Sequence, residues 1–150
     1  LKRKINFNLS KDSNLLLCEN IIFGRTSMKE EFEKGYFSDF WNINIDKKLI
    51  HTEAINTGLF EKKYLNSFST LNNNSAVATI IIVGNKFLNN VNNLSETLTN
   101  NENTTSNYSH WDNKLIVRLL SKDSYNLKFA IDKILSYFFE GSKIPKVWNI

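Results

Sequence analysis

One run of eight residues, Ala76–Val83, most restricts the fold of this chain. It is apolar at every position except Thr79, it is rich in β-branched side chains, and Gly84 follows it directly. A run of this length and composition is typical of a strand buried on both faces, and it is too short to cross a membrane. Because such a strand needs a neighbour on each side, the sequence predicts a sheet in which Ala76–Val83 is central.

Short segments bounded by turn residues recur along the rest of the chain, as in mainly β proteins. In residues 5–9, apolar side chains alternate with asparagines, which predicts a half-buried strand. The turn at residues 46–48 joins two segments into a predicted hairpin. The other predicted strands share short length and high apolar content: residues 15–23, 36–45, 49–55 and 115–120. Because these strands follow one another without alternating helices, we predict a β layer or stack rather than βαβ units.

Two helices are predicted toward the C-terminus. Apolar residues recur at helical spacing over residues 86–99, although the asparagines there have low helix propensity. The last helix has a continuous apolar stripe, an N-cap at Ser121 or Asp123, and Gly141 just beyond its end. Residues 57–75 and 100–109 are predicted to be loops, the first with at most one short strand or helical turn. The predicted fold is mainly β, a layer or stack of strands with two α-helices toward the C-terminus, in one domain over residues 1–150.

Composition narrows the classes of function. The net charge of +4 comes from scattered lysines and arginines, and this arrangement does not support nucleic-acid binding, although an acidic protein partner would suit it. The single cysteine, Cys18, excludes an internal disulfide and a cysteine-based zinc site, and its apolar strand predicts a buried thiol. We expect a cytoplasmic protein without a membrane segment. The chain begins with Leu1 in a strand pattern, so we expect an incomplete N-terminus.

Few residues point to catalysis or metal binding. His51 and Glu53 share one face of a predicted strand and would form half of a metal site, with His110 and Asp112 as a second pair. Histidines beside polar neighbours are more often ordinary surface residues. No nucleophile motif, phosphate-binding loop or zinc-protease motif is present. The sequence therefore predicts no enzyme, and a hydrolase that uses His51 and Glu53 is the least favoured alternative.

A polar loop, Gly24–Phe32, separates two predicted strands. Gly24 can adopt the positive φ values of a tight turn, and Arg25 lies within reach of the glutamates that follow it. At the other end of the chain, Pro145 precedes Trp148 in a tail predicted to be extended. Trp148 is predicted to return to the core, with a role as an anchor in a partner's pocket as the alternative.

These segments, taken in order, resemble the urease accessory protein UreD (UreH) family. The first motif is the loop with Gly24-Arg25, Met28, Glu30 and Phe32, which resembles "GR…MGE.F". The others are Arg118-Leu119-Leu120 followed by Ser124, similar to "RLL…S", and Pro145-Lys146-Val147-Trp148, similar to "PRxW". The resemblance covers the C-terminal part of the family's length. Lys29 replaces the usual Gly, and Lys146 replaces the usual Arg and lacks its bidentate fork.

The resemblance implies stacked, β-helix-like strands of the UreD type with two α-helices toward the C-terminus, and it implies a non-catalytic scaffold. Such a protein binds apo-urease and, with UreF and the GTPase UreG, helps to deliver nickel through an internal channel. It implies transient Ni²⁺ transfer by weak ligands and no tightly bound cofactor. Glu30 is then expected to be internal, paired with Arg25 or lining a nickel path, and the helices are expected to bind UreF. The alternative is a generic β-rich module that binds an acidic protein or a carbohydrate.

By the same resemblance, Gly24 and Arg25 set the geometry of the loop. Arg118 and Trp148 are expected to be architectural residues that join strand, helix and tail.

Overall fold

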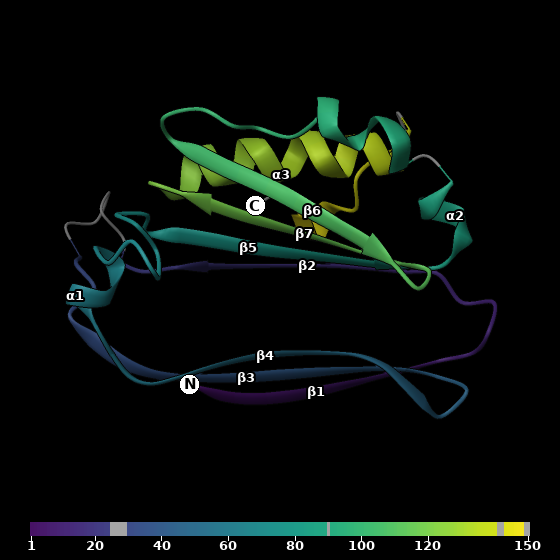
Figure 1. Ribbon diagram of the computed structural model, residues 1–150, viewed down its shortest axis with the longest axis horizontal. Helices are drawn as coiled ribbons and strands as arrows, with labels where there is room; N and C mark the ends of the chain where they lie inside the picture. Colours follow the sequence, from purple (N-terminus) through teal and green to yellow (C-terminus); the bar gives the residue numbers. More distant parts are fainter. Residues whose placement is uncertain (25–29, 90, 141–142, 149–150) are drawn as a thin grey trace. The chain divides into compact units, whose positions relative to one another are not determined.

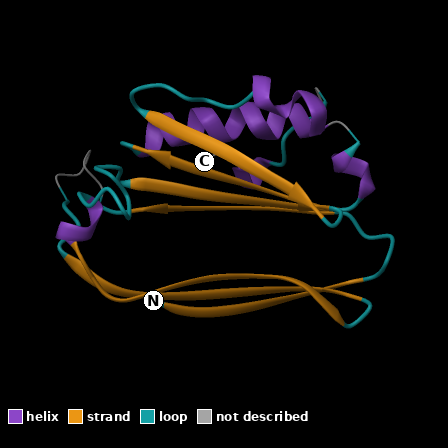
Figure 2. Ribbon diagram, in the orientation of Figure 1, coloured by secondary structure: helices purple, strands orange, loops and turns teal. Residues whose placement is uncertain are grey.

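The computed structural model describes residues 1–24, 30–89, 91–140 and 143–148, apart from the side chain of Val147. The described chain is mainly β, with its helices concentrated toward the C-terminus, which confirms the predicted fold class (Figures 1 and 2). It divides into two compact units. Unit 1 comprises residues 1–13 and 24–72, and unit 2 comprises residues 14–23 and 73–150. Whether these units behave as the one domain predicted from sequence stays a prediction.

Unit 1 is built on a three-stranded sheet in the order β1-β3-β4. Strand β1 (Lys2–Leu9) pairs in parallel with β3 (Lys34–Ile45), and β3 pairs antiparallel with β4 (Lys48–Glu61). The predicted hairpin is therefore confirmed. Its turn has positive φ angles at Asp46 (47°) and Lys47 (68°), which match the right-handed twist of the two strands. Strand β4 extends further into the predicted loop than expected, and helix α1 (Lys62–Leu65) follows it.

The two faces of the unit 1 sheet have different side chains because successive residues of a strand point to opposite sides. On one face, Trp41 and Ile43 of β3 are buried. On the other, the Asn42 amide donates to Asn6 Oδ1 at 3.0 Å and accepts from the Thr52 hydroxyl at 3.0 Å. The second face is therefore a ladder of hydrogen-bonded amides and hydroxyls.

Unit 2 contains an antiparallel four-stranded sheet in the order β2-β5-β7-β6. Its strands are β2 (Leu15–Ile22), β5 (Ala76–Val83), β7 (Lys114–Ser121) and β6 (Thr104–Trp111). Strand β5 lies between β2 and β7, and its residues from Ile80 to Val83 are at most 1% exposed. The prediction of a central strand buried on both faces is confirmed.

Helix α3 (Ser124–Phe139) supplies the other half of the unit 2 core. Asp123 caps its N-terminus, because Asp123 Oδ1 accepts from the backbone N–H of Asn126 at 2.7 Å. The apolar stripe predicted from sequence is buried and comprises Leu127, Ile131, Ile134, Leu135 and Phe138. The cap prediction at Gly141 lies outside the described residues, and Glu140 takes a left-handed conformation at the C-cap (φ 45°).

Two predictions of local structure are wrong. Residues 86–99 do not form one helix, because α2 (Asn85–Leu88) ends after one turn and the 3₁₀ helix η2 (Val91–Glu96) follows. The asparagines of this segment have low helix propensity, so its apolar residues are buried in two short pieces instead. Residues 100–109 were predicted to be a loop, but β6 begins at Thr104. The polar composition of residues 100–109 led to the prediction of a loop, but a strand at the edge of a sheet needs few apolar side chains.

Candidate functional site

Gly24 holds the Gly24–Phe32 loop in a conformation that other residues would strain. Its φ angle is +86°, and a Cβ atom there would lie 2.9 Å from both the Glu30 carbonyl oxygen and the Phe32 nitrogen. The two ends of the loop are therefore in close contact at Gly24. Arg25 and Met28 lie outside the described residues, so the predicted roles of these two residues stay predictions.

The described end of this loop joins an aromatic cluster in unit 1. The Phe32 ring lies 5.8 Å from Phe60, which in turn stacks on Tyr64 at 5.5 Å. Glu30 is exposed. The expectation that its carboxylate is internal is therefore wrong, whereas the described Phe32 ring is partly buried beside Phe60. The expected pairing of Glu30 with Arg25 stays a prediction, because Arg25 lies outside the described residues.

The neighbouring Glu31 forms an ion pair with Lys62 at the surface of unit 1. The hydrogen bond from Lys62 and its positive charge lower the pKa of Glu31, and the same contact raises the pKa of Lys62. Both side chains are well exposed, so this pair positions the loop beside α1 and contributes little stability.

The strand-to-helix motif lies at the junction of β7 and α3 in unit 2. Arg118 of β7 donates from Nη1 to the Thr79 hydroxyl of β5 at 2.9 Å, while Leu119 is 1% exposed on the opposite face. Ser124 is the first residue of α3. Arg118 thus bridges two strands of the sheet, while Leu119 contributes to the core.

The terminal motif forms a turn rather than the predicted extended tail. The 3₁₀ helix η3 (Lys146–Trp148) begins just after Pro145, whose carbonyl accepts from the Trp148 N–H at 3.0 Å. Trp148 is partly buried against the unit 2 core, with its ring 6.0 Å from Phe139. The prediction that Trp148 returns to the core is confirmed.

The buried sheet face of unit 1 carries a group of polar side chains that sequence analysis found only in part. The Arg3 guanidinium donates to both carboxylate oxygens of Asp39, which is 3% exposed. The Asp39 carboxylate raises the pKa of Arg3 through this hydrogen bond and its charge. Arg3 Cζ also lies 5.7 Å from the centroid of the Trp41 ring. The alternating pattern of β1 and β3 could have placed Arg3 and Asp39 on the buried face, but not opposite each other.

His51 and Glu53 lie on the same buried face, as predicted from their i, i+2 spacing. His51 Nε2 is 3.4 Å from Glu53 Oε2, and the side chains are 11% and 10% exposed. Glu53 is opposite Trp41 in the strand register, and His51 is opposite Ile43. Within the described part of the chain, no three His, Cys, Asp or Glu side chains are grouped to hold a metal ion. The second predicted pair does not share a strand face, because His110 lies in β6 whereas Asp112 lies in the turn that follows this strand.

Cys18 of β2 is partly buried against the unit 2 core. Burial, followed by the nearby charge of Asp132, raises the pKa of Cys18 to about 11. The thiol is therefore protonated at neutral pH and is a poor nucleophile, as expected for a small core residue.

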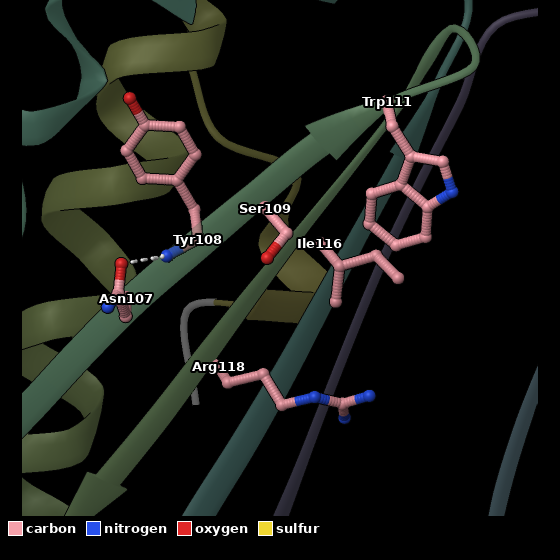
Figure 3. A pocket seen from close by; sticks show the side chains of 6 residues that line it. All are labelled: Asn107, Tyr108, Ser109, Trp111, Ile116 and Arg118. Atoms are coloured by element: carbon pink, nitrogen blue, oxygen red, sulfur yellow. Dashed lines mark hydrogen bonds between the residues drawn. The ribbon is translucent and has the colours of Figure 1, made fainter.

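A groove of about 320 Å³ lies on the β6–β7 hairpin of unit 2. It is lined by aromatic, amide, hydroxyl and guanidinium groups, from Asn107, Tyr108, Ser109, Trp111, Ile116 and Arg118. Figure 3 shows the side chains of Trp111, Ile116 and Arg118 on one side of the hairpin, whereas Tyr108 points toward α3. Sequence analysis missed this groove because its strand, β6, was predicted to be a loop.

The fold and the positions of the motifs first define a class: a mainly β protein of two sheet-based units. In it, the three motifs occupy a loop between strands, a strand-to-helix junction and a terminal turn. Among the described residues, each helix is too short or too polar to span a membrane.

The comparison with known families then gives the particular family. The family described as UreD urease accessory protein matches residues 1–149, and the chain belongs to this family. The urease accessory protein UreD of Rhizobium leguminosarum bv. viciae is 31% identical over 153 residues, which cover 100% of this chain and 54% of that protein. The UreD of Granulibacter bethesdensis is 38% identical over 82 residues, 55% of this chain and 34% of that protein. The chain thus spans about half the length of the Rhizobium relative.

Proposed function

We propose that this chain is a non-catalytic scaffold in the maturation of urease. It acts with UreF and the GTPase UreG on apo-urease, in the cytoplasm, while the nickel centre is assembled. The observation that carries this proposal is the UreD family match over residues 1–149, supported by relatives named urease accessory proteins that align with the whole chain. The proposed role needs binding surfaces and a way to pass on a metal ion, and candidate residues for each are proposed below.

Nickel is cargo in this proposal, not a resident cofactor. Ni²⁺ that must be released again requires few and exchangeable ligands, because a closed cage would retain it. His51 and Glu53 supply one imidazole and one carboxylate 3.4 Å apart, and both ligand types suit a divalent ion of this kind. We assign these two residues, rather than the exposed Glu30, as the first candidates for transient contact with Ni²⁺.

The exposed face of α3 is the proposed docking surface for UreF. Tyr125 is 80% exposed and Phe129 is 57% exposed, one helical turn apart. Lys133 follows after another turn, with its Nζ 5.9 Å from the Phe129 ring centroid. Lys128 and Asp132, which flank this stripe, are only half-exposed. Exposed aromatic side chains beside a lysine are suitable anchors for a partner protein.

Co-purification tests the proposal. The tagged chain is expressed together with urease subunits, UreF and UreG of the same source, and the complexes that elute are identified by their stoichiometry. The proposal predicts that UreF or apo-urease elutes with the chain in a fixed ratio. A folded chain that retains neither partner would contradict it.

Two matched pairs of variants separate the proposed surfaces. Phe129→Asp should abolish UreF retention, whereas Phe68→Asp, at an 86% exposed phenylalanine of unit 1, should leave it unchanged. His51→Ala should reduce nickel-dependent urease activation without loss of the complex, whereas His110→Ala, on exposed β6, should not. If both phenylalanine variants changed UreF retention equally, the docking surface on α3 would be wrong. If both histidine variants changed urease activation equally, the assignment of His51 to nickel contact would be wrong.

A further inference from the structure

Strand β6 is an outer strand of the unit 2 sheet, and only part of its outer edge is covered. In an antiparallel pair, successive residues direct their backbone N–H and C=O groups alternately toward the partner and away from it. In β6, the backbone N–H and C=O groups of the even-numbered residues point away from β7. The N–H groups of the first three of these residues donate instead to asparagine Oδ1 atoms: Thr104 to Asn101 at 2.9 Å, Ser106 to Asn100 at 2.8 Å, and Tyr108 to Asn107 at 2.8 Å.

The segment before β6 covers the first half of this edge. Asn101 accepts from the Thr104 N–H and also donates its own N–H to the Thr104 carbonyl at 2.9 Å. Thr99 makes two further hydrogen bonds with the Ser106 hydroxyl, at 2.9 Å each. A strand from another protein cannot pair there without displacing these contacts.

The second half of the edge is open. At Tyr108, the outward N–H donates to the side chain of the adjacent Asn107, and no other acceptor for it is found among the described residues. Across the described ranges, nothing accepts from the outward N–H of His110, which is exposed. An uncovered edge of this kind is a template for an added strand.

The groove described above lies beside the open half of the edge. Trp111 is 42% exposed there, and Lys114 Nζ lies 4.8 Å from its ring centroid. Arg118 is exposed, and its Nη1 donates to the Thr79 hydroxyl of β5. Figure 3 shows Ser109, Trp111 and Arg118 along this side of the hairpin. The groove therefore combines an aromatic surface with positive charge.

We propose that the edge at Tyr108–Trp111 and the adjoining groove bind an extended, acidic segment of another protein as an added β-strand. The backbone of the segment pairs with Tyr108 and His110. Its alternate side chains lie over the groove, with a carboxylate toward Arg118 and an apolar group against Trp111. Main-chain hydrogen bonds supply affinity in this mode of recognition, and the alternate side chains supply specificity. The surface is separate from the exposed stripe of α3, so this inference does not depend on the proposed binding of UreF.

Fluorescence anisotropy with defined peptides tests the inference on the full chain. The probe is a fluorescein-labelled six-residue peptide that alternates valine with glutamate. Its comparison peptides carry lysine in place of glutamate, or proline at a central valine. The glutamate peptide should bind at least tenfold more tightly than either. It should also shift the backbone amide NMR signals of residues 108–111.

Three variants locate the site. His110→Pro removes an outward N–H without removing a donor from the β6–β7 ladder, and Trp111→Ala removes the aromatic surface. Each should weaken binding at least tenfold, whereas Tyr125→Ala on α3 should leave it unchanged. Circular dichroism checks that all three remain folded.

Four results would overturn the inference. These are equal binding of the glutamate and lysine peptides, unchanged binding by His110→Pro and Trp111→Ala, no binding at millimolar peptide, or pairing of β6 with a second copy of the chain. The last is detected by sedimentation as a dimer that His110→Pro dissociates.

Discussion

Unit 2 buries an apolar core between one sheet face and α3, whereas unit 1 places the Arg3–Asp39 ion pair and the polar side chains of His51 and Glu53 on the buried face of its sheet. The unit 2 core consists of aliphatic and aromatic side chains from β5, β7, α3 and the short helices. In unit 1, the buried Trp41 and Ile43 share their face with Asp39 and Glu53, which are 3% and 8% exposed. The difference indicates that burial of apolar area stabilises unit 2, whereas unit 1 depends on the correct partner for each charge.

The largest expected effect is in the unit 2 core. Ile134→Ala removes a side chain that is fully buried between α3 and the sheet, and it should lower the free energy of unfolding by about 3–4 kcal/mol. Urea titration measures this change. Phe129→Ala on the exposed face of α3 is the control and should change stability by less than about 0.5 kcal/mol. Similar values for the two variants would mean that α3 does not supply the core of unit 2.

A charge change tests unit 1. Asp39→Asn leaves the Arg3 guanidinium without its carboxylate and should cost about 2 kcal/mol, less than for a fully buried pair because Arg3 is 37% exposed. In Asp39→Asn, amide hydrogen exchange should become faster in the strands of unit 1 than in those of unit 2. The double variant Arg3→Gln with Asp39→Asn also removes the positive charge that has lost the Asp39 carboxylate, and it should be more stable than Asp39→Asn alone. A double variant as unstable as the sum of both single changes would contradict this account.

Alkaline pH should destabilise unit 2 through Cys18. The folded pKa of Cys18 is about 11, above the ordinary value of 9.0, so the unfolded chain loses the thiol proton first as the pH rises. The contribution of Cys18 to stability is therefore intact below pH 9 and falls between pH 9 and 11, by about 2 kcal/mol. Urea titrations at pH 8 and 10.5 measure the loss. Cys18→Ala should remove this part of the pH dependence, and an unchanged dependence would assign it to other groups.

The smallest expected effect is at the start of α3. Asp123→Ala removes the cap on the Asn126 N–H and should cost about 1 kcal/mol, measured by thermal or urea unfolding. Asp123→Asn should keep most of the stability because an amide oxygen also accepts this hydrogen bond. If both variants lose the same amount, the charge of Asp123 rather than its hydrogen bond stabilises the helix.

The sequence by itself determined the mainly β class, the central strand β5, the β3–β4 hairpin and the apolar stripe of α3. These features depend on local periodicity and on hydrophobic content, which can be read along the chain. The N-cap of α3 was narrowed by the sequence to Ser121 or Asp123, and the structure selects Asp123, whose side chain bonds three residues away. The motif order also identified the family, which the comparison over residues 1–149 confirms.

Only the tertiary structure decided which distant residues meet. The Arg3–Asp39 pair joins residues 36 apart in the chain through the parallel register of β1 and β3, and no local pattern encodes that register. The sequence did not predict strand β6, because its side chains are mostly polar and such a strand is stable only at the edge of a sheet. The position of β6 at the edge follows from its pairing with β7. Glu30 was assigned to the interior from its motif, yet burial of a side chain depends on what the whole chain places around it. The groove beside β6 likewise could not be predicted from the sequence, because its lining residues come from two strands that only the fold brings together.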